Sequence, residues 1–148
     1  MEWQKNGFRI TTEESKMDTK YIHEFLSTKS YWAEGIPIDT VEKSIRGSLC
    51  FGVFSNERQV GFARAITDKA TFAWLADVFI DDRYRGQGLG KWLMEVIISH
   101  EDLQGLRRIM LGTKDAHGLY AQYGFIPLPY PERMMTIHHP EVYKKKIS

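Results

Sequence analysis

The stretch Asp81–Gly90, with the sequence DDRYRGQGLG, separates two segments of different hydrophobic pattern. Residues 72–80 before it are almost all apolar, which is typical of a buried strand. After it, apolar residues recur at helical spacing, namely Leu89, Trp92, Leu93, Val96 and Ile97. The predicted order is therefore a strand, a glycine-rich turn and a helix, and the rest of the chain is interpreted around this unit.

Three glycines alternate within the turn, Gly86, Gly88 and Gly90. Glycine adopts positive φ at little cost and has no Cβ to block a ligand. The first amides of the following helix lack backbone partners, and the helix dipole places partial positive charge beside them. We therefore predict that this turn binds an anion, specifically a phosphate.

Two common phosphate-binding motifs do not fit the turn. A P-loop ending at Lys91 would need glycine in place of Arg85 and Ser or Thr in place of Trp92. A dinucleotide-binding fingerprint starting at Gly86 would need glycine at Lys91, and it normally opens the first βαβ unit of a fold. A plain glycine-rich turn between strand and helix is the remaining non-functional alternative.

The turn instead resembles the pyrophosphate loop of the GNAT acetyltransferases, which has Arg or Gln, two residues, Gly, one residue, and Gly or Ala. Arg85, Gly88 and Gly90 match this pattern. A second family signature, Asn, two residues, Ala, three residues, Tyr, three residues, Gly, Phe, corresponds to residues 113–125. Its matching positions are Ala116, Tyr120, Gly124 and Phe125, whereas Thr113 replaces the asparagine that contacts the cofactor in the family.

The pattern of apolar residues and turns predicts the elements in order. Strands are expected at residues 8–12, 49–55, 60–66, 72–80, 107–111, 125–128 and 134–137, and helices start near residues 18, 39, 88 and 115. This order is that of the GNAT fold, so the resemblance covers nearly the whole chain. It implies an α/β fold with a mixed, mostly antiparallel sheet of about six to seven strands and about four helices.

The resemblance implies acetyl-CoA as the cofactor. Backbone amides of the turn would hold its pyrophosphate, and an amide of Val78 or Phe79 would stabilise the thioester oxygen, in a strand whose bulge separates the two central strands. The residues expected to contact the cofactor are Val78, Phe79, Ile80, Arg85, Gly86, Gln87, Gly88, Leu89, Gly90, Thr113, Ala116 and Tyr120.

Two residues are candidates for proton transfer. By resemblance, Tyr120 protonates the leaving thiolate, because a phenol with a pKa near ~10 stays protonated at neutral pH. A core aromatic role is the alternative for Tyr120. Asp77 interrupts the apolar strand and could take the proton of the attacking amine. Alternatively, Asp77 pairs with a backbone amide or with Arg64, and a water chain removes the proton.

The loop after the first predicted helix carries Tyr31, Trp32 and Glu34. In the GNAT fold this loop lies over the cleft, so these side chains would bind a cationic amine through cation–π and ionic contacts. Trp32 could equally anchor the loop to the core. The sequence leaves open whether the acceptor is a small molecule, a peptide or a protein.

Composition narrows the functional classes further. The chain of 148 residues fits one domain, residues 1–148. A net charge of +1 argues against a dedicated nucleic-acid-binding surface. The lone Cys50 cannot form an internal disulfide, and no zinc-type pairing exists, so we expect no metal. No apolar run approaches the ~18 residues of a membrane span. We expect a cytoplasmic protein without a membrane partner, whose apolar edge strands could pair two copies into a homodimer.

Together these features predict an enzyme that transfers an acetyl group from acetyl-CoA to a primary amine by direct attack in a ternary complex. The alternative is a non-catalytic acyl-CoA-binding or sensor module that keeps the phosphate turn without turnover. The presence of Tyr120 favours the enzyme, because a sensor would not need a proton donor beside the sulfur.

Overall fold

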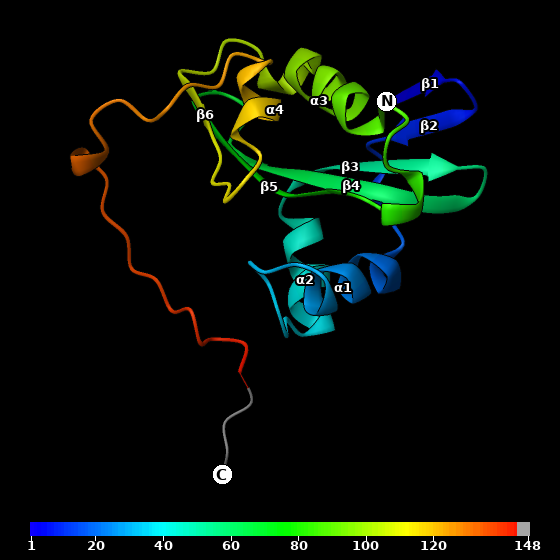
Figure 1. Ribbon diagram of the computed structural model, residues 1–148, viewed down its shortest axis with the longest axis horizontal. Helices are drawn as coiled ribbons and strands as arrows, with labels where there is room; N and C mark the ends of the chain where they lie inside the picture. The colour runs from blue at the N-terminus through cyan, green and yellow to red at the C-terminus, as the bar shows by residue number, and fades with distance from the viewer. Residues whose placement is uncertain (145–148) are drawn as a thin grey trace.

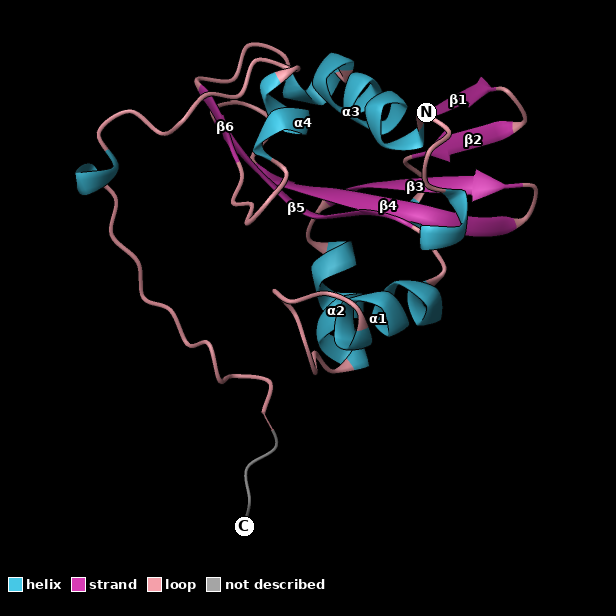
Figure 2. Cartoon of the chain, in the orientation of Figure 1, coloured by secondary structure: helices cyan, strands magenta, loops and turns pink. Residues whose placement is uncertain are grey.

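A mixed sheet is the centre of the fold in the computed structural model of the protein, which describes residues 1–144 (Figures 1 and 2). Within these residues the sheet has six strands in the order β1-β2-β3-β4-β5-β6, and only β5 and β6 are parallel. The strands are β1 (Glu2–Lys5), β2 (Phe8–Thr11), β3 (Leu49–Ser55), β4 (Arg58–Thr67), β5 (Phe72–Ile80) and β6 (Arg108–Met110).

Helices cover both faces of the sheet (Figure 1). The described α-helices are α1 (Thr19–Thr28), α2 (Ile38–Arg46), α3 (Leu89–Ser99) and α4 (His117–Ala121). Short 3-10 turns η1 (Glu14–Lys16), η2 (Asp82–Tyr84), η3 (Glu101–Leu103) and η4 (Pro131–Arg133) connect them. The α/β architecture predicted from the sequence is confirmed. No helix within residues 1–144 combines the length and the apolarity needed to cross a bilayer.

Two hydrophobic clusters hold the layers together. On one face, Leu93 and Met94 of α3 pack against strand residues such as Phe51 and Leu75. On the other face, Phe25 of α1 stacks on Phe79 of β5, with ring centroids 3.8 Å apart. Because the middle strands are buried on both faces, they appear in the sequence as continuous apolar runs rather than as alternating patterns.

Several local predictions are confirmed. Asp18 caps α1 by accepting a hydrogen bond from the amide of Tyr21, at the helix start predicted near residue 18. The strand predicted at residues 72–80 has these bounds in β5. Cys50 is buried, and burial raises the pKa of its thiol to about 12, so it is a packed and unreactive group.

The chain ends differ from the prediction. The strands expected at residues 125–128 and 134–137 are absent, and these residues form irregular, mostly exposed backbone. Prolines at 127, 129 and 131 supply no amide for a ladder, which explains part of the difference. Conversely, β1 was not predicted, because its residues are polar apart from Trp3.

Residues 126–144, which we call the C-terminal arm, leave the body beside β6. The arm runs clear of the sheet and ends near the loop between α1 and α2 (Figure 1).

Candidate active site

The last part of β5 has an open edge. Strand β6 pairs with β5 only from Phe72 to Trp74, and within residues 1–144 no strand pairs with Leu75–Ile80 on that side. The backbone groups of such an edge can accept an extended ligand in the manner of an added strand. This edge ends at the glycine-rich turn that follows β5. An extended ligand on the edge would therefore reach a turn that can bind a phosphate.

The turn is anchored at its first residue. Asp81 is buried, and its amide donates to the carbonyl of Val60 over 2.7 Å. The carboxylate accepts hydrogen bonds from the amide and guanidinium of Arg83 and from the hydroxyl of Tyr21. The bonds from Arg83 are the largest cause that lowers the pKa of Asp81 to about 2. Asp81 therefore fixes the start of the turn to β4 and to α1.

Two of the three glycines in the turn have the positive φ that the sequence predicted. Gly86 and Gly88 have φ values of 81° and 80°, and a Cβ on either would meet nothing within 4 Å. Gly90 lies within α3 and has no positive φ. Because Gly88 caps α3 without a side chain, the first amides of the helix face the turn. The guanidinium of Arg85 lies 3.0 Å from Asp82 and is mostly exposed.

The predicted contact residues of β5 point in different directions. Phe79 is buried on the α1 face, whereas Val78 and Ile80 pack against the α3 cluster. The side chain of Leu89 also belongs to that cluster, so only its amide is available to a ligand in the turn, and Gln87 is exposed.

A bulge displaces Asp77 from the β4–β5 ladder. The pairs on either side are Phe62 with Phe79 and Arg64 with Ala76, and Asp77 has a φ of 53°. Bulges commonly redirect a side chain beside an active site. The family resemblance implied a bulge in this strand, and the structure contains one.

Both carboxylate oxygens of Asp77 have partners. One accepts from Nε of Arg64 over 2.6 Å and the other from Nε1 of Trp32 over 2.7 Å. Arg64 also donates to the hydroxyl of Ser48. This is the ion pair that the structural alternative for Asp77 anticipated, and it additionally ties the loop after α1 to the bulge.

The second family signature, at residues 113–125, lies beside the loop after α1. The hydroxyl of Thr113 accepts from the amide of Ala116, just before α4. Tyr120 packs edge-on against Phe125, and burial, followed by the neighbouring phenol of Tyr31, raises the pKa of Tyr120 above its ordinary value. Its hydroxyl therefore stays protonated at neutral pH.

The hydroxyl of Tyr31 accepts from the amide of Lys114 over 3.0 Å, so the two segments are in direct contact. In contrast, Tyr123 donates to the carbonyl of Lys91 on α3.

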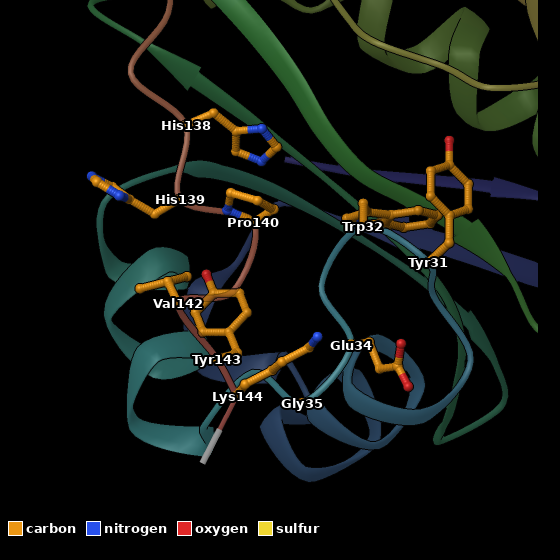
Figure 3. Close-up of a pocket in the computed structure, with 10 residues that line it drawn as sticks. All are labelled: Tyr31, Trp32, Glu34, Gly35, His138, His139, Pro140, Val142, Tyr143 and Lys144. Carbon is orange, nitrogen blue, oxygen red and sulfur yellow. The ribbon is translucent and has the colours of Figure 1, made fainter. Parts of the chain in front are cut away.

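A cavity of about 460 Å³ lies beside this loop (Figure 3). Tyr31, Trp32 and Glu34 line it from one side, as the sequence predicted for the acceptor loop. The C-terminal arm forms the other side, and the lining residues there are His138, His139, Pro140, Val142, Tyr143 and Lys144. The ring of His138 points toward Trp32, whereas His139 points away (Figure 3).

Sequence reasoning assigned no role to the arm residues at this cavity. About a hundred residues separate them from the loop, and no local pattern indicates the contact.

Comparison with known proteins gives consistent results. The family model described as an acetyltransferase (GNAT) domain matches residues 46–127. A putative acetyltransferase of Gibberella zeae is 32% identical over 142 residues, covering 81% of this chain and 79% of its own.

Among solved structures, a putative GNAT acetyltransferase from Xanthomonas campestris pv. campestris has a TM-score of 0.91 and 48% identity, covering 93% of this chain and 97% of its own. A GNAT family acetyltransferase from Elizabethkingia anophelis with acetyl-CoA bound shares the fold, with a TM-score of 0.63 at 15% identity, covering 84% of this chain and 80% of its own.

Proposed function

The chain belongs to the GNAT acetyltransferase family, and from this premise we propose that it transfers the acetyl group of acetyl-CoA to a primary amine by direct attack in a ternary complex. One observation carries the proposal: the open edge of β5 leads into a helix whose N-cap, Gly88, has a positive φ and no side chain. We further propose that residues 1–148 act as one cytoplasmic domain.

The turn supplies the binding site for the pyrophosphate. Amides from Arg85 to Gly90 donate to its oxygens, and the positive end of the α3 dipole favours their charge. The missing Cβ atoms at Gly86 and Gly88 let the backbone approach closely. Arg85 is exposed, so it can exchange its contact with Asp82 for a phosphate oxygen at little cost.

The pantetheine would extend along the open edge of β5. In that position it pairs with backbone groups from Val78 to Ile80, which no strand within residues 1–144 occupies on that side. An amide of Val78 or Phe79, beside the bulge, is then the donor for the thioester oxygen as it gains negative charge.

Tyr120 is the proposed general acid. Its hydroxyl remains protonated because burial raises its pKa, so it can donate a proton to the sulfur as the carbon–sulfur bond breaks. Transfer leaves coenzyme A as a thiol and the acceptor as an acetamide. The proton released by the amine passes to water, and a proton from water restores the phenol of Tyr120.

Base catalysis by Asp77 stays a prediction. Two strong donors, Arg64 and Trp32, already occupy its carboxylate, which favours a holding role over proton uptake. We therefore propose that Asp77 keeps Trp32 over the cleft, and that water carries the amine proton away. The cavity between Trp32 and the C-terminal arm would hold the acceptor, with Glu34 attracting its positive charge.

Calorimetry and a thiol-release assay test this function. We expect saturable heat with acetyl-CoA, and release of coenzyme A when the protein meets at least one member of a panel of polyamines, amino acids, aminoglycosides and lysine peptides. Binding without release for every amine would favour the acyl-CoA sensor instead. The absence of heat with both coenzyme A and acetyl-CoA would contradict the proposal.

A further inference from the structure

The cavity beside the loop after α1 has two chemically different ends (Figure 3). At the end nearer the sheet lies Trp32, whose indole nitrogen is bonded to Asp77 of the β5 bulge. At the other end, beside the helices, lie the charged side chains of Glu34 and Lys144 (Figure 3). A ligand that fills the cavity therefore meets an aromatic ring at one end and two opposite charges at the other.

The indole of Trp32 is held in place and is still open to a ligand. Its nitrogen donates to Asp77, and the ring of Tyr31 packs edge-on against it with ring centroids 5.1 Å apart. Even so, 44% of Trp32 is exposed. A fixed and partly exposed indole face attracts an ammonium group. Because the proposed donor to the thioester oxygen lies beside the same bulge, the reacting amine belongs at this end of the cavity.

The two charges at the other end act on each other. The pKa of Lys144 is raised, first by its contact with Glu141 and then by the charge of Glu34. The pair with Glu141 is exposed, so Lys144 can exchange it for a ligand carboxylate at little cost. Glu34 is also exposed and can accept from a ligand ammonium. This end therefore suits a group that carries both charges, whereas a polycation would be repelled by Lys144.

The C-terminal arm limits the size of the acceptor. Tyr143 packs into the α1–α2 cluster, and the arm residues before it form a turn in which the amide of Val142 donates to the carbonyl of His139. The cavity between arm and loop measures about 460 Å³, within the roughly 300–1,000 Å³ of pockets for small ligands. A free small molecule fits this space, whereas a folded protein surface would have to displace the arm.

On the basis of the proposed function, we infer that the acceptor is a free α-amino acid whose side chain ends in a primary amine. Lys144 binds its carboxylate and Glu34 binds its α-ammonium, while the side-chain amine lies against Trp32 beside the bulge. Pro140 and Val142 also line the cavity and supply apolar surface for the methylene chain in between.

The orientation of the acceptor determines the product. The neutral side-chain amine attacks the thioester carbonyl, and a carbon–nitrogen bond forms as the carbon–sulfur bond breaks. The amine proton passes to water, and Tyr120 protonates the sulfur. The products are coenzyme A and an amino acid acetylated on its side-chain nitrogen, with the α-amine unchanged. The position of the acetyl group therefore reports how the acceptor was bound.

Four related amines separate the contributions of the charges. Lysine carries all three groups, lysine amide and cadaverine lack the carboxylate, and ε-aminocaproic acid lacks the α-ammonium. We expect kcat/KM for lysine to exceed that for lysine amide and for cadaverine by ~5-fold or more, as for one lost ion pair. The same comparison of ornithine with putrescine covers a shorter chain. Mass spectrometry should locate the acetyl group on the side-chain nitrogen.

Variants at the charged end test the assigned contacts. Lys144→Glu should reverse the preference, so that cadaverine is acetylated faster than lysine, because the new carboxylate attracts a second ammonium. Lys144→Gln should remove the preference without reversing it. Glu34→Gln should lower kcat/KM for lysine and leave that for ε-aminocaproic acid nearly unchanged. Lys43→Gln, an exposed change on α2 away from the cavity lining, is the control and should keep the preference.

Failure of this inference is distinct from failure of the proposed function. The inference is overturned if cadaverine is acetylated as efficiently as lysine, if the α-amine is acetylated, or if Lys144→Glu keeps the original preference. Activity with aminoglycosides or lysine peptides but with neither lysine nor ornithine would overturn it as well. In all of these cases acetyl transfer to an amine still stands. Absence of coenzyme A release with every amine would instead contradict the proposed function, and this inference with it.

Discussion

Tyr120 shows how a single side chain receives its chemistry from its surroundings. Burial raises the pKa of its phenol, so the group is neutral throughout the physiological range and acts as a donor. Tyr123, three residues later, is not a matching position of the signature, and its hydroxyl donates to the carbonyl of Lys91. The two hydroxyls are therefore a matched pair for testing the acid assignment.

Replacing Tyr120 with Phe should lower kcat by about 10²-fold or more, while the affinity for acetyl-CoA changes little. Because the pKa of Tyr120 lies above its ordinary value, the loss should be similar at every pH from neutral to mildly alkaline. Tyr123→Phe, the control, should keep kcat near that of the unmodified protein. Steady-state kinetics at several pH values measure both, and full activity of Tyr120→Phe would contradict its role.

Asp77 is the other residue whose role depends on its contacts. Removing its charge leaves Arg64, with only 17% of its side chain exposed, without its partner. Asp77→Asn should therefore lower the free energy of unfolding by about 3 kcal/mol, as for other buried pairs that lose one member. Urea denaturation measures this loss.

The double variant Asp77→Asn, Arg64→Met should recover part of the lost stability, because it leaves no unpaired charge. Glu13→Gln, which breaks an exposed pair with Lys16, is the control and should have little effect. If Asp77→Asn keeps full stability but abolishes an ionisation in the pH profile of kcat/KM, the carboxylate is a base rather than a holding group.

At the scale of elements, the junction between β5 and α3 is built for close approach of a ligand. Gly88 must adopt a left-handed backbone to end the turn and begin the helix. Replacing it with Ala should cost about 1 kcal/mol of stability through backbone strain and should weaken binding of acetyl-CoA. Calorimetric titration measures the affinity.

Gly105 offers a matched control for this change. Its φ is 73° and a Cβ there also meets nothing within 4 Å, but it lies between η3 and β6, outside the turn. Gly105→Ala should therefore cause similar backbone strain without lowering the affinity for acetyl-CoA. Equal effects of the two variants on affinity would contradict a role for the turn in binding.

Asp81, at the start of the turn, should also make the free energy of unfolding depend on pH. The pKa of Asp81 is about 2 in the folded protein, below the ~3.9 of an unfolded chain. Its contribution is therefore present above pH ~4 and is lost as the pH falls toward 2.

Because Arg83 is half-exposed and screened by water, we expect this contribution to be about 1 kcal/mol. Asp81→Asn should remove it, so the stability of the variant and of the unmodified protein should converge at low pH. Urea midpoints measured between pH 2 and 6 test this, and a constant difference across that range would contradict it.

At the scale of the whole molecule, the cavity proposed for the acceptor is built from two distant parts of the chain. Tyr31, Trp32 and Glu34 line one side of it, and residues of the C-terminal arm such as His138 and Tyr143 line the other. The cavity therefore depends on the whole fold rather than on a single element.

The sequence by itself determined the elements whose signals are local. Hydrophobic spacing and caps predicted β5, α3 and the start of α1, and short motifs indicated the family, because each depends on residues within a few positions of one another. The apolar pattern also indicated strands at residues 125–128 and 134–137, where the structure has none.

Only the tertiary structure decided what depends on distant contacts. It paired Asp77 with Trp32, joined Tyr31 to Lys114, and brought His138 to the acceptor loop. It also left the arm without a partner strand. Pairing between strands and between side chains is set by which segments meet in space, and a local pattern carries no information about the segment on the other side.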